Sequence, residues 1–307
     1  MQTTPLDITV PDLDVKYPTK PPSPLHMPSM YFLMGIIGSR GSGKTTKLVQ
    51  MLQLYNKCKT FDVIRFWGPS WDDDVKYRLI EKMDCKLVVQ REYNDALFQE
   101  SLHEIDADIA LYDEYLNKRA LYRRWLKDKK DLKEFKGREL REIESWNYQK
   151  PKAPWRYGKP NTLIIADDLS GTSFYRADSK GVQNAFFIRH RHRCCSVIFL
   201  TQTYTNSIPR GIRTNLSAVM LFSNRNAGMA AQICTEFSSY ISVEAFQAMW
   251  DAATADSQHD AFFVDFESPP ESRYRKNFDR AFVLPKKGIP LETKPINSKQ
   301  KVQQNEP

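Results

Sequence analysis

The sequence has no apolar run approaching the roughly 20 residues that a membrane-spanning helix needs. Its N-terminus lacks the charged start and apolar core of a secretory signal. The five cysteines are an odd number without regular spacing, which argues against a disulfide framework. These absences favour an intracellular protein in a reducing compartment, with no expected membrane partner.

The composition is that of an ordinary globular chain, with 41% hydrophobic and 12% aromatic residues among 307. Lysine and arginine number 45 against 37 aspartates and glutamates, for a formal charge of +8. A basic balance suits a polyanionic partner such as nucleic acid. A well-solvated basic surface would explain the same net charge, so a nucleic-acid partner can be inferred only from where the basic residues lie in the chain.

The clearest indication of function is a glycine-rich segment, residues 38–46, between an apolar run and an amphipathic pattern. Residues 31–37 predict a buried strand, and the spacing of Leu48, Met51, Leu52 and Tyr55 predicts a helix after it. Glycines at such a turn let backbone N–H groups wrap a phosphate chain. The predicted phosphate-binding (Walker A) residues are Gly38, Ser39, Arg40, Gly41, Ser42, Gly43, Lys44, Thr45 and Thr46.

Within this loop, Lys44 is expected to reach the β- and γ-phosphates of ATP, and Thr45 to offer its hydroxyl to Mg²⁺. The positive end of the following helix would face the anion. A glycine-rich turn without a ligand is the alternative. The complete pattern, set between a predicted strand and a predicted helix, favours nucleotide binding.

A second candidate site is the acidic pair that ends the apolar segment Leu163–Ala166. Asp167 would hold Mg²⁺, directly or through water, and Asp168 would polarise the attacking water, as in a Walker B strand. Aspartate also starts many turns, so the acidic pair alone is weak evidence for a metal site. Together with the phosphate loop it predicts a magnesium-dependent triphosphatase.

The apolar segment 196–200 ends in Thr201 and Gln202. Ligands of open α/β sheets bind beyond the carboxyl ends of the strands, which would place Gln202 beside Asp167 as a sensor of the γ-phosphate. The alternative is an amide that merely caps the strand. Glutamine can orient water or phosphate but cannot abstract a proton.

Further apolar segments with helical patterns between them predict an α/β fold: a mainly parallel central sheet flanked by helices, as in P-loop NTPases. Residues 1–29 predict a proline-rich extended arm, 30–283 the ATPase domain, and 284–307 a flexible tail. A charged helical insertion is predicted at about 94–158. A helix from about 72 to 83 is expected between the strands at 63–67 and 86–89.

The order of these motifs, with the basic segment 190–192 and the segment 208–215 after the sensor strand, resembles the viral genome-packaging ATPases of the FtsK–HerA class. The resemblance covers residues 31 to about 266, without the insertion and the ends. It implies a homo-oligomeric ring, a pentamer or hexamer, that hydrolyses ATP and drives double-stranded DNA into a capsid. Many relatives carry glutamate where this chain has the shorter Asp168.

The resemblance also implies that an arginine reaches the γ-phosphate of a neighbouring subunit, here Arg213, with Arg210 as the other candidate. Either residue is alternatively an ordinary surface or DNA-facing arginine. His190, His192, Cys194 and Cys195 offer zinc-ligand types, but consecutive positions entering a strand point to opposite faces. We therefore expect no zinc site there.

The predicted insertion mixes cations with aromatic residues that could grip a phosphate backbone, although a solvated, salt-bridged helical face explains it equally. The residues concerned are Lys118, Arg119, Tyr122, Arg123, Arg124, Trp125, Lys127, Lys129 and Lys130. A capsid or portal protein is a further expected partner, and the site of virion assembly, in host cytoplasm or nucleus, or the virion itself, the expected location. The alternatives are a helicase or transfer ATPase of the same class, or a nucleotide-gated adaptor with little turnover.

Overall fold

The computed structural model describes residues 21–127, 135–147, 149–175, 182–204, 207–224, 226–238, 240–283 and 292–295. The first half contains β1 (Leu33–Ile37), α1 (Lys44–Lys57), β2 (Val63–Trp67), η1 (Pro69–Trp71), η2 (Val75–Tyr77), α2 (Arg78–Glu81), β3 (Lys86–Gln90), α3 (Asp95–Lys127) and α4 (Arg138–Ser145). The middle contains β4 (Thr162–Asp167), η4 (Ser173–Tyr175), α5 (Val182–Arg189), η5 (His190–Arg193), β5 (Cys195–Thr201), α6 (Arg210–Arg213) and β6 (Ala218–Phe222). The last part contains α7 (Ala227–Phe237), α8 (Val243–Thr254), β7 (Ala261–Asp265), α9 (Pro270–Arg273), β8 (Tyr274–Lys276), β9 (Arg280–Val283) and β10 (Glu292–Pro295).

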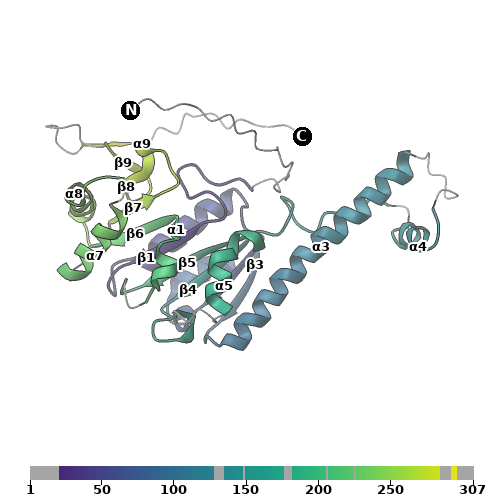
Figure 1. Cartoon of the computed structure of the whole chain (residues 1–307), viewed down its shortest axis with the longest axis horizontal. Helices are drawn as coiled ribbons and strands as arrows, with labels where there is room; N and C mark the ends of the chain where they lie inside the picture. Colours follow the sequence, from purple (N-terminus) through teal and green to yellow (C-terminus); the bar gives the residue numbers. More distant parts are fainter. Residues whose placement is uncertain are drawn as a thin grey trace, which may run out of the picture.

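A single ten-stranded sheet runs through the molecule in the order β10-β9-β8-β7-β6-β1-β5-β4-β2-β3 (Figure 1). The strands from β6 to β3 in this order are all parallel, whereas β7 to β10 are added antiparallel. The predicted mainly parallel sheet is therefore confirmed, with an antiparallel extension that the sequence patterns did not indicate. In this order β5 lies between β1 and β4.

The parallel strands are buried on both faces, which is why their sequences read as continuous apolar runs. Leu33 and Ile37 of β1 pack in one core cluster, whereas Met34 and Ile36 pack in the other. This alternation follows from the two-residue period of a strand. The sheet is thus the middle layer between two hydrophobic cores.

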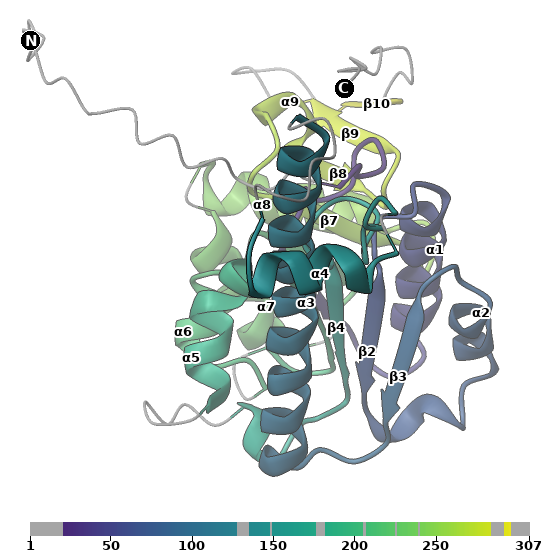
Figure 2. The same cartoon turned by 90° about the vertical axis from the view of Figure 1, so that its right-hand side faces the viewer.

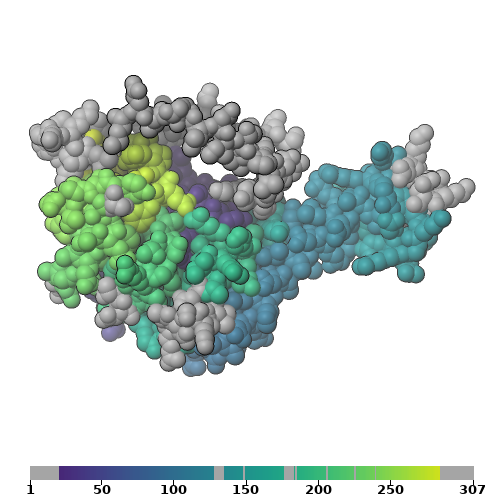
Figure 3. Space-filling model, in the orientation of Figure 1, coloured from purple at the N-terminus to yellow at the C-terminus, as the bar shows by residue number. Residues whose placement is uncertain are grey.

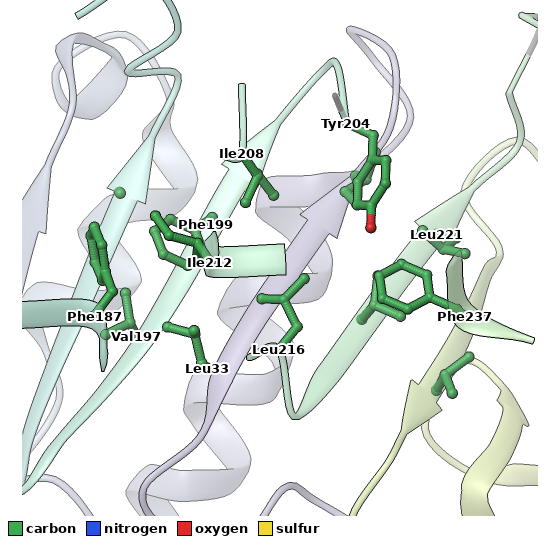
Figure 4. Close-up of a cluster of buried hydrophobic side chains, with 14 of the residues drawn as sticks. Leu33, Phe187, Val197, Phe199, Tyr204, Ile208, Ile212, Leu216, Leu221 and Phe237 are labelled. Carbon is green, nitrogen blue, oxygen red and sulfur yellow. The ribbon is translucent and has the colours of Figure 1, made fainter. Parts of the chain in front are cut away.

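Helices cover both faces of the sheet (Figure 2). Apolar side chains of α1, η1 and α2 build one core with the sheet. The other core takes side chains from the first turns of α3 and from α5, α6, α7 and α8. Figure 4 shows part of it, where Ile208, Ile212 and Leu216 lie over Leu33 and Phe199.

The outer part of α3 leaves this body and carries α4 near its end (Figures 1 and 3). Phe98, Leu102 and Ile105 on the inner turns belong to the main core. A separate small cluster at the outer end joins Trp125 to Phe135 and Ile143. We call residues 109–127 together with 135–147 the projecting arm. The inner turns of α3, although within the range predicted as an insertion, are part of the main helical layer.

Two further details differ from the sequence expectations. The helix expected at about 72–83 is replaced by the shorter η2 and α2, because the segment turns to bring Tyr77 and Ile80 into the core. Residues 292–295 of the predicted tail form β10, the edge strand of the sheet, which pairs with β9. The remaining tail and residues 1–20 lie outside the described residues.

The end of the predicted N-terminal arm lies against its own chain. The carbonyl oxygen of Pro22 accepts a hydrogen bond from Thr60, and that of Pro28 accepts one from Tyr55. Met27 and Met30 are buried in the core beneath α1. Within the described ranges, no helix combines the length and the apolar character needed to cross a membrane.

Candidate nucleotide-binding site

The candidate site lies at the edge of the sheet where four neighbouring parallel strands end. Ile37 of β1 pairs with Thr201 of β5, and Leu200 of β5 pairs with Asp167 of β4. Trp67, the last residue of β2, pairs with Ala166 of β4. The loops that follow β1, β4, β5 and β2 therefore emerge side by side, as expected at the carboxyl edge of a parallel sheet.

The phosphate loop connects β1 to α1. Gly43 precedes the helix with a φ of 102°, a left-handed conformation that disfavours other residues. The Nζ atom of Lys44 donates to the carbonyl oxygens of Gly38 and Ser39 at 2.7 and 3.0 Å, which holds the ammonium over the loop. Burial lowers the pKa of Lys44, while the nearby carboxylates of Asp167 and Asp168 raise it.

Asp167 is almost completely buried at the end of β4. Its Oδ2 atom accepts a hydrogen bond from Tyr77 at 2.6 Å and another from the Ser70 hydroxyl. Burial raises the pKa of Asp167, and these two donors together with Lys44 oppose the shift. The carboxylate is thus held in a fixed orientation close to Lys44.

Asp168 and Gln202 lie together on the exposed side of this edge. Asp168 has a φ of 50°, so the chain turns sharply after Asp167 and presents the second carboxylate to solvent. The Gln202 Nε2 atom lies 3.5 Å from Asp168 Oδ2, at the limit of a hydrogen bond. The amide therefore meets Asp168, whereas the strand pattern had predicted it beside Asp167.

These groups surround one cavity of about 620 Å³. Its lining comprises Arg40, Gly41, Gly43, Lys44, Thr45, Thr46, Pro69, Ser70, Asp73, Asp74, Lys76, Asp167, Asp168, Leu200, Thr201, Gln202 and His259. Gly38, Ser39 and Ser42 complete the loop but do not line the cavity. The predicted Walker A, Walker B and sensor residues thus converge on the same space.

The residues present fit a magnesium–nucleotide complex. Thr45 and Asp167 both line the cavity, together with the Lys44 ammonium that would face the phosphates. Thr45 and Asp167 are oxygen donors, which Mg²⁺ prefers, and this ion usually combines one or two carboxylates with substrate phosphates. Within the described ranges no group of three or more His, Cys, Asp or Glu residues could hold a metal alone. A Mg²⁺ ion held by Thr45 and Asp167 would take its remaining ligands from water and the nucleotide phosphates.

Arg213 does not line the cavity. Its Nε atom lies 3.1 Å from Glu236 Oε1, its Nη1 atom donates to the Ile208 carbonyl at 2.9 Å, and its guanidinium lies over the Tyr204 ring. The structure thus places Arg213 in contacts within its own chain, while Arg210 is exposed. The predicted action of Arg213 on a neighbouring subunit would require it to leave Glu236.

The other candidate residues fall outside the site. The His190 ring lies 2.7 Å from the Phe187 carbonyl and is buried, while His192 is exposed. Cys194 and Cys195 are buried beside the start of β5. Of the basic residues predicted for the insertion, Lys129 and Lys130 lie outside the described residues, and the others belong to α3.

Sequence reasoning missed the contribution of the loop after β2. Gly68 approaches Asp167 so closely that a Cβ atom there would lie 2.4 Å from the Asp167 carbonyl oxygen. Ser70 and Tyr77, on the same segment, reach the Asp167 side chain. Ser70, three residues after the predicted strand 63–67, was the available signal for this contribution. His259, whose Nδ1 atom lies 3.2 Å from the Ser42 carbonyl, had no such signal.

A phosphate loop between a central parallel strand and a helix, with acidic and amide residues at the ends of the adjacent strands, defines a P-loop NTPase fold. No protein-family model and no curated protein matches the sequence. The fold assignment rests on the strand order and on the loop geometry of this chain.

Solved structures similar to this one include the genome packaging NTPase B204 from Sulfolobus turreted icosahedral virus 2, at 15% identity and a TM-score of 0.45, covering 80% of this chain and 95% of that one. The type VII secretion ATPase EccC of Thermomonospora curvata is similar at 16% identity and a TM-score of 0.43, covering 77% of this chain and 24% of that one. The pCW3 conjugation coupling protein TcpA is similar at 11% identity and a TM-score of 0.37, covering 77% of this chain and 58% of that one. A genome packaging NTPase is thus among the similar structures.

Proposed function

We propose that this protein is an ATP-hydrolysing motor that moves double-stranded DNA into a viral capsid, working as a homo-oligomeric ring. The observation that carries the ATPase part is the convergence of Lys44, Thr45, Asp167, Asp168 and Gln202 on one cavity. The DNA-packaging part is supported by the order of motifs along the chain and by the net charge of +8. Such a motor would act inside the host cell, at the site of virion assembly.

In this proposal the backbone N–H groups of the loop and the Lys44 ammonium bind the β- and γ-phosphates. Thr45 and Asp167 hold Mg²⁺, which would neutralise charge on the phosphates when bound. Asp168 and Gln202 lie close enough together to orient a water for in-line attack on the γ-phosphate. Asp168 is the exposed carboxylate of the pair, and in this proposal it accepts the proton of the attacking water.

Steady-state phosphate release by the full chain, with and without double-stranded DNA, tests this proposal. We expect magnesium-dependent release that DNA stimulates. Tight ATP binding without release would instead favour the nucleotide-gated adaptor. Release stimulated by DNA, combined with failure to package into capsids, would favour the helicase or transfer ATPase.

A further inference from the structure

Tyr77 contacts one of the two candidate metal-holding residues. Its phenol donates to Asp167 Oδ2 at 2.6 Å. Tyr77 ends η2, on the segment that follows β2, whereas Asp167 ends β4. A phenol from the segment after β2 therefore reaches the predicted Walker B carboxylate.

The surroundings of Tyr77 fix this phenol in place. The side chain is completely buried, its ring stacks on Trp71 with centroids 5.3 Å apart, and the Phe66 ring meets it edge-on at 4.7 Å. Trp71 and Tyr77 both belong to the short helical segments after β2. A buried tyrosine with such aromatic contacts has little rotational freedom, so its hydroxyl is directed at Asp167.

Ser70 supplies a second donor from the same segment to the same oxygen, Oδ2 of Asp167. Among the described residues, no hydrogen bond reaches the other oxygen, Oδ1. Two donors on one carboxylate oxygen orient the group and leave Oδ1 available to a metal or to its bound water. Groups that orient a metal ligand in this way typically change metal affinity about 10–100-fold when removed.

We propose that Tyr77, assisted by Ser70, is a positioning residue that aligns the Asp167 carboxylate for one divalent cation. This inference rests on the proposed nucleotide-binding function, because the cation would be shared with the nucleotide phosphates. Tyr77 would influence cation binding through the orientation of Asp167, and its phenol itself would touch neither the cation nor the nucleotide.

The test is binding of Mn²⁺, as a paramagnetic probe, to the full chain carrying a non-hydrolysable ATP analogue. We expect Tyr77→Phe to weaken Mn²⁺ binding about tenfold, while binding of the analogue measured in EDTA stays at the wild-type level. Ser70→Ala, which removes only the second donor from a partly exposed side chain, should weaken Mn²⁺ binding in the same direction.

The matched control is Tyr175→Phe. Tyr175 is also buried and close enough to Asp167 to be influenced by its charge, but among the described residues its hydroxyl has no hydrogen-bond partner. We expect this variant to bind Mn²⁺ as the wild type does.

Unchanged Mn²⁺ binding in Tyr77→Phe would overturn the inference. An equal loss of Mn²⁺ affinity in Tyr77→Phe and Tyr175→Phe would also overturn it, because the loss would then come from disturbed packing around Asp167. Failure of the proposed function is recognised separately, because the wild-type chain would then bind no analogue even in EDTA.

Discussion

The nucleotide cavity and the projecting arm stabilise their charged groups in different ways. At the cavity, Asp167 is buried and receives defined hydrogen bonds from Ser70 and Tyr77. On the arm, the ion pair between Arg124 and Glu139 leaves both side chains more than 40% exposed. Exposed pairs contribute about 0–1 kcal/mol and are screened by salt. Single substitutions should therefore have large, specific effects at the cavity and small, distributed effects on the arm.

The largest effect is expected from Lys44→Ala. The ammonium is the charge held over the loop, and removing a group that stabilises the transferring phosphate lowers turnover about a hundredfold or more. Phosphate release at saturating ATP measures the effect. Lys57→Ala, at the exposed end of the same helix, is the control and should retain activity. Undiminished release by Lys44→Ala would remove the basis of the proposed function.

Asp167→Asn and Gln202→Ala should differ from each other. The first removes a metal-holding carboxylate, so activity should no longer respond to Mg²⁺. The second should bind ATP normally and hydrolyse it about a hundredfold more slowly, because the amide acts on the attacking water after binding. Nucleotide titration combined with phosphate release separates the two phenotypes. Normal turnover by Gln202→Ala would contradict the sensor role.

If Asp167 holds the cation, its environment predicts the acid limit of cation binding. Its raised pKa means that the carboxylate is protonated at a higher pH than an ordinary aspartate near 3.9, so cation binding should be lost at a higher pH. The charged and titratable groups around it are Lys44, Asp168, Tyr77 and Tyr175. Tyr77→Phe removes a donor to the carboxylate and should move the acid limit further upward. A pH profile of Mn²⁺ binding measures this shift.

An intermediate effect is expected at the two arginines that follow the sensor strand. Arg213→Ala breaks the partly buried contacts with Glu236 and the Ile208 carbonyl, and should lower the free energy of unfolding by about 1–3 kcal/mol. Arg210→Ala, at an exposed position, should change it by less than about 0.5 kcal/mol. Chemical denaturation of both variants measures the difference.

Mixed rings test which arginine completes a neighbouring active site. If Arg213 acts across the subunit boundary, combining Arg213→Ala with Lys44→Ala subunits should restore part of the turnover, because some interfaces then pair an intact Lys44 with an intact Arg213. A mixture that stays inactive, although gel filtration shows mixed rings, would assign Arg213 to its own chain. Arg210 is then the residue to test in the same way.

The smallest effect is expected from reversing the charges of Arg123, Arg124 and Lys127 on the arm. Stability should be nearly unchanged. If these cations bind DNA, the slope of log affinity against log salt should flatten by about 0.9 for each phosphate that the variant no longer neutralises. Reversal of the exposed Arg78 and Lys82 on the opposite side of the sheet is the control. An unchanged slope in the arm variant would make the arm an ordinary solvated face.

The strands and the phosphate loop could be predicted because each depends on a local pattern, such as the apolar run before Gly38 or the acids after Ala166. The placement of Tyr77 could not, because its contact with Asp167 depends on β2 lying next to β4, about 100 residues later in the chain. The contacts of Arg213 with Glu236 depend likewise on the packing of α7. The antiparallel strands β8–β10 escaped notice because they are only three or four residues long.

The inner turns of α3 anchor the projecting arm to the sheet. Arg65 of β2 is buried and donates to Glu104 at 2.6 Å, so α3 is fastened to the strand whose following loop carries Ser70 to Asp167. From Glu104 to Lys127 the helix continues for about 35 Å at 1.5 Å per residue. A tilt of about 5° at this anchor would displace the outer end by about 3 Å over that length. A small tilt of the helix at this anchor, close to the segment that contacts Asp167, would therefore become a larger displacement far from the sheet.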